Sequence, residues 1–304
     1  MRNFTFKGLF LAVVFMVLGS LSIQAADGLI TKQITIKLDE AGTLPDKIGS
    51  TKKNQITNLK IIGEINGTDF AMIREMAGDD KWNTPTNGML SVLDLSDAKI
   101  VEGGDYYFNT GHRYGYTSND KIDDYAFYGC SGLTSLTLPS GVTEIGDDAF
   151  SGCSGLTNLT LPFGVTKIGY SAFSGCSGLT SLTLPSGVTK IGSSAFSGCS
   201  GLTSIYVYAE KLPNMGNDVF DGCDAKKCTV YVPKGTYDDY WLSEFGYFEN
   251  IVEFEATGIN NVITSNDAKE LSRYSVNGQR LSAPTKGLNI VKYSDGSVKK
   301  VAVQ

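Results

Sequence analysis

The chain has little of what an enzyme or a metal site requires. Its 304 residues contain a single histidine, His112, and no C-x-x-C pair, so a zinc site with several histidine or paired cysteine ligands is not expected. We find no glycine-rich phosphate loop, no calcium-loop motif and no G-x-S-x-G nucleophile motif. Because catalysis needs convergent reactive groups, the sequence predicts a protein that is not an enzyme and that carries no cofactor and no metal.

Long apolar runs are also missing. The one concentrated run, residues 9–18, follows Arg2 and Lys7 and precedes the small residues at 22–26, which is typical of a secretory signal peptide. This run is too short to span a bilayer, so no transmembrane span is predicted. We therefore expect residues 1–26 to be a signal peptide and the protein to be exported to the cell surface or the extracellular space, with the periplasm as the alternative.

Basic residues are too few for a nucleic-acid partner. The chain has 26 Lys and Arg against 32 Asp and Glu, and loss of Arg2 and Lys7 leaves 24 against 32, a net charge of about -8. Such a surface repels polyanions, and no basic stripe with aromatic residues is visible. Nucleic acid is therefore not an expected partner.

One 23-residue phrase is present four times, starting at Ile122, Ile145, Ile168 and Ile191. A fixed period of about 20 to 29 residues that contains L-x-x-L-x-L indicates a leucine-rich repeat solenoid, in which each coil stacks on the next. We expect one parallel sheet of roughly eight strands, with one strand and a short helix or turn in each 23-residue coil.

The cysteines follow the same period. Cys130, Cys153, Cys176, Cys199 and Cys223 share one repeat offset and are predicted to form an inward ladder of buried thiols. Neighbouring members would lie about 5 Å apart with parallel side chains, whereas a disulfide needs Cβ atoms about 3.8 Å apart. Cys228 lies outside the ladder, and a local bridge between Cys223 and Cys228 is the alternative.

The phrase G-x-x-A-F-x-G-C-x-x-L-x-x-L-x-L-P resembles the BspA-type leucine-rich repeat family of bacterial cell-surface proteins. It differs from the commoner leucine-rich repeat consensus because Pro139, Pro162 and Pro185 follow the predicted strand directly, where proline ends it. The stretch from Ile56 to Val101 is similar to the N-terminal part of such proteins. The resemblance implies adhesion at the bacterial surface.

Residues 27–121 are predicted to form an N-terminal cap of irregular coils. A short helix is expected at residues 68–76, capped by Thr68 or Asp69. Residues 103–121 lack periodicity and are predicted to be a loop that joins the cap to the repeats, with the aromatic residues at 106–108 packed down on it. The alternative is an adaptable binding loop, because the segment is rich in the residue types of such loops.

Residues 122–256 comprise the repeats and a C-terminal cap, and residues 257–304 a small all-β module. An aromatic cluster is predicted to close the stack, with an exposed binding patch as the alternative; it comprises Tyr237, Tyr240, Trp241, Phe245, Tyr247 and Phe248. In the module, four strands are expected at 273–276, 279–281, 288–293 and 297–303, joined by turns at Asn277-Gly278 and Asp295-Gly296. The module resembles the C-terminal secretion-sorting domain of exported Bacteroidota proteins, which implies docking to secretion machinery.

The outward face of the predicted sheet is the remaining candidate for function. At one outward offset, small threonines give way to tyrosines towards the C-terminal end, a change that strand formation does not require. The candidate partner-binding residues are Thr137, Thr160, Thr183, Tyr206, Tyr208 and Tyr231, with Asn158 in the flanking row. We expect an exported, non-enzymatic adhesin that recognises a host matrix protein, another cell or a glycan. The alternative is a structural or assembly component of the bacterial envelope.

Overall fold

The computed structural model describes residues 28–254 and, in the C-terminal part, the strands at 270–275, 280–281, 287–293 and 298–303. The predicted signal peptide and the two predicted turn dipeptides of the C-terminal module lie outside the described residues. In the described residues no helix is both long enough and apolar enough to cross a membrane.

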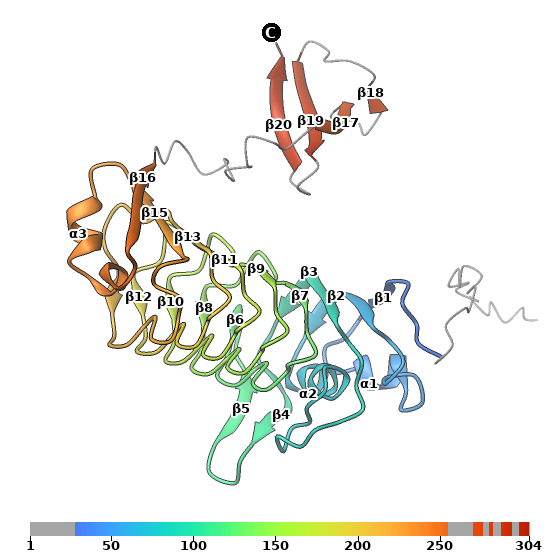
Figure 1. Cartoon of the computed structure of the whole chain (residues 1–304). Coiled ribbons are helices and arrows are strands. Elements are labelled where there is room, and N and C mark those ends of the chain that lie inside the picture. Colours follow the sequence, from blue (N-terminus) through green and yellow to red (C-terminus); the bar gives the residue numbers. More distant parts are fainter. Residues whose placement is uncertain (1–27, 255–269, 276–279, 282–286, 294–297, 304) are drawn as a thin grey trace, which may run out of the picture.

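The main body is a stack of coils, and each coil contributes one strand to a parallel array (Figure 1). These strands are β1 (Ile34–Lys37), β2 (Asn58–Ile65), β3 (Val92–Ile100), β7 (Ser135–Thr137), β9 (Asn158–Thr160), β11 (Ser181–Leu184), β13 (Ser204–Val207), β15 (Thr229–Pro233) and β16 (Asn250–Phe254). Leu136 lies opposite Leu159, and Leu182 lies opposite Ile205. The predicted parallel stacking and its register are confirmed.

The prediction of a single sheet is wrong, because the array divides into a sheet of five strands, β1-β2-β3-β7-β9, and a sheet of four, β11-β13-β15-β16. Strands β9 and β11 are neighbours across this division. The backbone hydrogen bond from Thr180 to Thr157 is 3.4 Å long there, whereas the equivalent bonds before and after it are 3.1 and 2.9 Å. The lengthening is confined to the strand side of these two coils, since their Phe150 and Phe173 rings lie 5.0 Å apart.

A second row of strands runs along another side of the stack (Figure 1). It consists of β6 (Lys121–Ile122), β8 (Glu144–Ile145), β10 (Lys167–Ile168), β12 (Lys190–Ile191) and β14 (Asn214–Met215), all parallel. Sequence analysis missed this sheet because two residues are too short to show the alternation of a strand.

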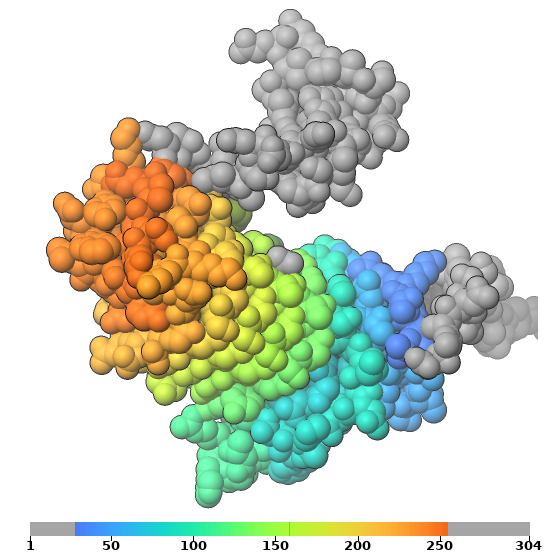
Figure 2. Space-filling view, viewed as in Figure 1, coloured from blue at the N-terminus to red at the C-terminus, as the bar shows by residue number. Residues whose placement is uncertain are grey.

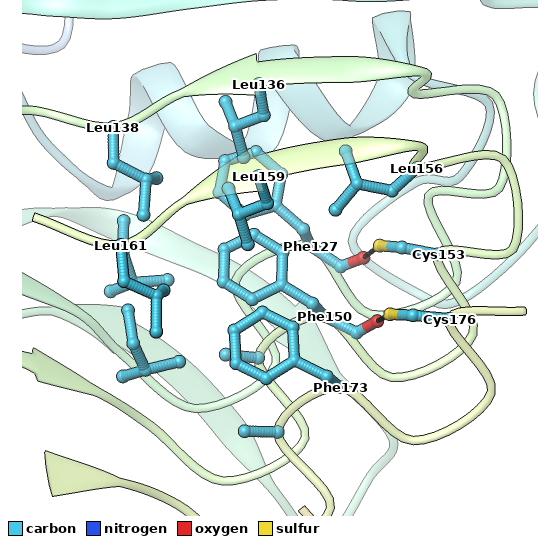
Figure 3. Packing of buried hydrophobic residues seen from close by; sticks show 14 of the residues in the cluster. Phe127, Leu136, Leu138, Phe150, Cys153, Leu156, Leu159, Leu161, Phe173 and Cys176 are labelled. Carbon is cyan, nitrogen blue, oxygen red and sulfur yellow. Dashed lines mark hydrogen bonds between the residues drawn. The ribbon is translucent and has the colours of Figure 1, made fainter. Parts of the chain in front are cut away.

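Aromatic rings form the centre of the repeats. Phe127, Phe150, Phe173, Phe196 and Phe220 stack in sequence at centroid distances of 5.2, 5.0, 5.2 and 5.8 Å. Figure 3 shows the first three of these rings. All five side chains are buried. Since a ring of one coil lies on the ring of the next, no single coil can complete its own core.

The predicted thiol ladder is confirmed, since all five cysteines at the repeat offset are buried with free thiols. The Cys153 thiol donates to the Phe127 carbonyl at 3.0 Å and the Cys176 thiol to the Phe150 carbonyl at 3.2 Å (Figure 3). Cys223 and Cys228 are also free thiols and form no bridge with each other. Burial raises the pKa of each of these two thiols to about 12.

The N-terminal region contains the helices α1 (Leu44–Ile48) and α2 (Gly67–Met76). The predicted helix is confirmed, but the predicted cap is wrong, because the N-cap is Asn66. The Asn66 side chain accepts from the Thr68 N–H at 3.0 Å, and the Asp69 side chain accepts from the Asn66 N–H at 2.9 Å. Asp69 therefore completes a capping box from the third helical position.

Residues 103–121 are not the irregular loop that we predicted. They contain an antiparallel hairpin of β4 (Gly103–Asn109) and β5 (Tyr114–Thr117), which projects from the stack (Figure 1 and Figure 2). Tyr107 and Phe108, both on β4, are buried as predicted, whereas Tyr106 is partly exposed. The missed signal was two short runs of residues with high β propensity on either side of a glycine-containing turn.

The aromatic cluster at the C-terminal end of the stack divides into two groups. Tyr240, Phe245 and Phe248 are buried, and the rings of Phe245 and Phe248 each lie 5.0 Å from that of Phe220, the last of the stacked phenylalanines. The other three aromatic residues, on or beside α3 (Tyr237–Trp241) and the 3-10 helix η1 (Glu244–Tyr247), are partly exposed: Tyr237, Trp241 and Tyr247. The buried group closes the core as predicted.

The C-terminal strands are β17 (Glu270–Ser275), β18 (Arg280–Leu281), β19 (Gly287–Tyr293) and β20 (Val298–Val303). They form an antiparallel sheet in the order β18-β17-β19-β20. Their bounds agree with the four expected strands to within about three residues.

A candidate partner-binding surface

The predicted outward row exists in both sheets. Thr137 lies opposite Thr160 in the first sheet, and in the second Thr183 lies opposite Tyr206, which lies opposite Tyr231. The side chains of Thr137 and Thr160 are exposed, and the other three are partly exposed. Asn158 pairs with Ser135 in the flanking row, and its side chain lies outside the described residues.

Tyr206 and Tyr231 stack face to face on this surface. Their centroids are 4.6 Å apart and their planes differ by 7°. The parallel register of β13 and β15 imposes this arrangement, because it places the two Cα atoms side by side with both side chains on the same face. The two rings therefore present one continuous aromatic surface, which we call the tyrosine pair.

Strand β16 extends this surface by one position. Val252 lies opposite Tyr231 and is 46% exposed. In the next outward row, the Tyr208 ring meets the Phe254 ring edge-on at 5.3 Å. Sequence analysis missed Val252 and Phe254 because residues 250–254 carry no copy of the repeat phrase, so nothing assigned them to the sheet.

The hydroxyl groups of Tyr206 and Tyr208 stay protonated in neutral solution. Burial raises the pKa of Tyr206, and the neighbouring Tyr231 raises it further. Burial likewise raises the pKa of Tyr208, with a smaller contribution from Tyr206. The phenols can therefore donate as well as accept hydrogen bonds to a partner.

The tyrosine pair is distinct from the aromatic cluster that closes the stack. In the described residues, the ring contacts of the closing cluster lead to Phe220 in the interior, whereas Tyr206 stacks on Tyr231 on the outward face. Tyr240 donates its hydroxyl hydrogen to the Ala209 carbonyl at 2.7 Å inside the cap. The geometry thus disfavours the interpretation that the outward tyrosines pack against the closing cluster.

The chemistry of the outward row changes along the stack. At the N-terminal end, Lys60 pairs with Asp94 at 3.0 Å and with Asp97 at 2.7 Å. Small hydroxyl residues follow in β7, β9 and β11, and aromatic rings follow in β13 and β15. Only the last segment combines apolar area with hydrogen-bonding groups, which is the composition typical of binding hot spots.

Nothing in the described residues resembles a metal centre or a catalytic site. No group of three or more histidine, cysteine or acidic side chains in this part of the chain is arranged to hold a metal ion. His112 lies exposed between β4 and β5.

Comparison with known proteins shows where the chain is similar to others. Residues 120–239 match the BspA type leucine rich repeat region family in six copies. No match was found among curated proteins.

Several solved structures of bacterial proteins are similar over part of the chain. A leucine-rich repeat protein from Bacteroides ovatus is 32% identical, with 45% of this chain and 36% of that one covered and a TM-score of 0.34. A leucine rich cell surface protein from Faecalibacterium prausnitzii is 22% identical, with 59% and 42% covered and a TM-score of 0.28. The pneumococcal vaccine antigen PcpA is 14% identical, with 65% and 57% covered and a TM-score of 0.34.

The aligned parts span less than half the length of the first two of these proteins. The family match covers the four copies of the repeat phrase and the first part of the C-terminal cap. Residues 120–239 are thus similar to the BspA-type leucine-rich repeats.

Proposed function

We propose that the chain is an exported, non-enzymatic adhesin that binds an extracellular protein or glycan through the outward face of its repeats, centred on the tyrosine pair. The observation that carries this proposal is the stacking of Tyr206 on Tyr231 at 4.6 Å on a face where the preceding coils carry threonine. Two stacked rings already held in register lose little conformational freedom when a partner binds.

The position of the pair also supports a binding role. Val252 and the Tyr208–Phe254 contact enlarge the apolar area around it, and protonated phenols supply hydrogen bonds at the same place. The threonines of β7, β9 and β11 would then form the polar rim, and Asn158 belongs to this rim by its strand position. A central aromatic anchor with a polar rim is the usual anatomy of a protein interface.

The test compares two double variants of the mature chain, residues 27–304. Tyr206→Ala with Tyr231→Ala removes the rings, whereas Tyr206→Phe with Tyr231→Phe keeps them as the matched control. Binding is measured on wells coated with collagen, fibronectin or laminin and on a glycan array. We expect the alanine pair to weaken binding by roughly 2 kcal/mol or more, with the phenylalanine pair close to wild type.

A partner that binds all three proteins equally would show that the tyrosine pair is not the site. Absence of binding to every probe, together with co-fractionation with envelope fragments, would favour the structural role instead. Thermal melting of each variant separates loss of binding from loss of folding.

We also propose the division of the chain into a signal peptide (1–26), an N-terminal cap (27–121), repeats with a C-terminal cap (122–256) and a small β module (257–304). The module would dock to secretion machinery, a role supported by its sequence resemblance to sorting domains. Removal of residues 258–304 should leave the melting of the repeats cooperative and change only where the protein is delivered. A truncated chain without a cooperative transition would make the module part of the cap.

A further inference from the structure

The hairpin of β4 and β5 carries a second exposed aromatic surface, separate from the tyrosine pair. Trp82 is 53% exposed, Tyr114 51% and Tyr116 54%, and Tyr106 lies among them partly exposed. The Tyr106 centroid is 5.8 Å from that of Trp82, 5.6 Å from that of Tyr114 and 6.4 Å from that of Tyr116. We call these four residues the hairpin aromatic cluster.

Folding does not account for this cluster, because a different set of rings anchors the hairpin. On its inner side, Phe108 stacks on Tyr125 at 4.5 Å, and the buried Tyr107 donates its hydroxyl hydrogen to the Asp124 carbonyl at 2.8 Å. A Cβ atom at Gly115 would lie 2.6 Å from the Tyr107 ring, so only glycine allows this close packing. The outer rings therefore remain exposed to solvent, while the inner contacts of Tyr107 and Phe108 hold the hairpin in place.

Two further hydrogen bonds hold the platform. The Asp105 N–H donates to the Thr68 hydroxyl at 3.0 Å, and the Asn109 N–H donates to the Lys81 carbonyl at 2.6 Å. The first bond ties β4 to helix α2, and the second ties β4 to the segment that carries Trp82. A ligand would therefore meet rings whose positions are set beforehand, which lowers the entropic cost of binding.

The hairpin is neutral, whereas the chain is acidic. In residues 103–117 Arg113 balances Asp105, whereas the chain as a whole has a net charge of -6. The Lys81 ammonium group lies 4.7 Å from the Tyr106 centroid and 5.8 Å from that of Trp82. Asp80 lies two residues before Trp82, and its carboxylate accepts hydrogen bonds from the Trp82 and Thr84 N–H groups. Exposed Asp105 precedes the rings on β4.

The size of the cluster argues against a folded protein as its main partner. An aromatic side chain offers about 150 to 250 Å² of surface, so four rings that are about half exposed present roughly 400 Å². A standard protein interface buries about 800 Å² on each side. A narrow chain that lies along the rings fits the available area better.

We propose that the hairpin aromatic cluster is a binding site for an anionic glycan chain, one that carries carboxylate or sulfate groups. The C–H groups on one face of a sugar ring carry slight positive charge and lie favourably against the negative face of an aromatic ring. Lys81, which lies beside two of the rings, would pair with the anionic groups. The Arg113 guanidinium is already engaged on the inner side, where it donates to the Tyr125 hydroxyl and lies 5.7 Å from the centre of that ring. This site is independent of the proposed function at the tyrosine pair.

The test uses the fluorescence of Trp82 in residues 27–304. The chain has two tryptophans, so Trp241→Phe, a change at a partly exposed position, leaves Trp82 as the only indole. The probes are hyaluronan oligosaccharides, which carry carboxylates, heparin oligosaccharides, which carry sulfates, and neutral dextran oligosaccharides. We expect a saturable change with at least one anionic probe that weakens with added salt, and none with dextran.

Two variants and one control sharpen the result. Tyr114→Ala with Tyr116→Ala should raise the Kd by about tenfold or more, the scale of losing a hot-spot residue. Lys81→Gln should raise the Kd and flatten its salt dependence. Tyr237→Ala, at a partly exposed ring on α3, and the double alanine variant of the tyrosine pair should leave the Kd unchanged.

The proposal is overturned if neither anionic probe binds, if dextran binds equally well, or if the Tyr114 and Tyr116 variant binds like the parent. Binding of single-stranded DNA in preference to both glycans would overturn the ligand class. Because the tyrosine pair variants serve as controls here, failure of this site and failure of the proposed function give different outcomes.

Discussion

In the repeat coils a given buried position is filled by the same residue type from one coil to the next, whereas the N-terminal region buries charged side chains. Phe150 and Phe173 occupy equivalent positions in adjacent coils, and both are 0% exposed. In the N-terminal region Asp69 and Arg74 are equally inaccessible. Both charged residues lie on α2, the helix that stands where the repeats have only turns.

The buried Arg74 connects α2 to other segments of the chain. The Arg74 guanidinium donates to the Tyr125 carbonyl at 3.0 Å and to the Asp80 carbonyl at 3.2 Å, and it lies 5.2 Å from the centre of the Phe108 ring. Within the repeats, like side chains meet like side chains and need no such network. The comparison teaches that side-chain hydrogen bonds between regular coils recur at equivalent positions, as with the thiols of Cys153 and Cys176. At the irregular end, the bonds of Arg74 each occur once.

The largest effect should come from a break in the phenylalanine stack. Phe150→Ala removes a buried ring that contacts the rings of both neighbouring coils, at 5.2 and 5.0 Å. We expect the free energy of unfolding to fall by about 3 to 5 kcal/mol. Urea denaturation of residues 27–304, followed by far-UV circular dichroism, measures this change.

The matched control is Phe163→Ala, which removes the same side chain from a turn of the same repeats. Phe163 is 67% exposed, so the change in unfolding free energy should stay within about 0.5 kcal/mol. Equal costs at Phe150 and Phe163 would contradict the description of the repeat interior.

A smaller loss is expected at Asp69, the buried carboxylate of the N-terminal region. It accepts hydrogen bonds from the N–H groups of Gly42 at 2.6 Å, Leu44 at 2.9 Å and Asn66 at 2.9 Å. Asp69→Ala leaves these donors without that acceptor and should lower the free energy of unfolding by about 2 kcal/mol. Urea denaturation again provides the measurement.

Asp69→Asn distinguishes the contribution of the hydrogen bonds from that of the charge, because asparagine keeps one acceptor oxygen but is neutral. This variant should lower the free energy of unfolding by less than Asp69→Ala. Asp46→Ala, at an exposed acidic residue in the first turn of α1, is the control and should change little. If Asp69→Ala changed the free energy of unfolding as little as Asp46→Ala, the hydrogen bonds of Asp69 would not stabilise this end of the stack.

The same contrast explains which parts of the fold were predictable. The 23-residue period fixes the environment of each position, so the strand register and the burial of Cys153 and Cys176 follow from spacing alone. The cap at Asn66 was missed because the choice among neighbouring polar residues depends on where Gly42 and Leu44 lie in space. The residues adjacent to Asn66 in the sequence give no indication of that contact.

The candidate surface was predictable only in part, for a related reason. The repeats supply a baseline of threonine against which tyrosine at 206 and 231 is visible as a change. The contribution of Val252 depends on β16 joining the sheet, which no repeat phrase signals. The hairpin aromatic cluster depends on Trp82 meeting Tyr106 across 24 residues of chain, and local pattern does not reveal such a contact.

The smallest expected effect concerns the N-terminal end of the outward row. There the outward positions hold the ion pair of Lys60 and Asp94, whereas the C-terminal end holds tyrosine rings. Burial tends to raise the pKa of Asp94, but hydrogen bonds from Ser96 and Lys60 together bring it below its ordinary value. A carboxyl group whose pKa is lower in the folded state adds stability above its unfolded pKa of about 3.9. That contribution is lost as the pH falls through the folded pKa.

Asp94→Asn should therefore lower the free energy of unfolding at neutral pH by at most about 1 kcal/mol, since the pair is largely solvent-screened. The difference between variant and wild type should shrink as the pH is lowered below about 4, because the wild-type carboxylate is then protonated as well. Glu64→Gln is the matched control, because Glu64 pairs with Lys99 at 3.1 Å and both side chains are more than half exposed. The measurement is the urea midpoint of variant and wild type across this pH range. If the difference between Asp94→Asn and wild type stays constant with pH, the pair contributes through packing rather than charge.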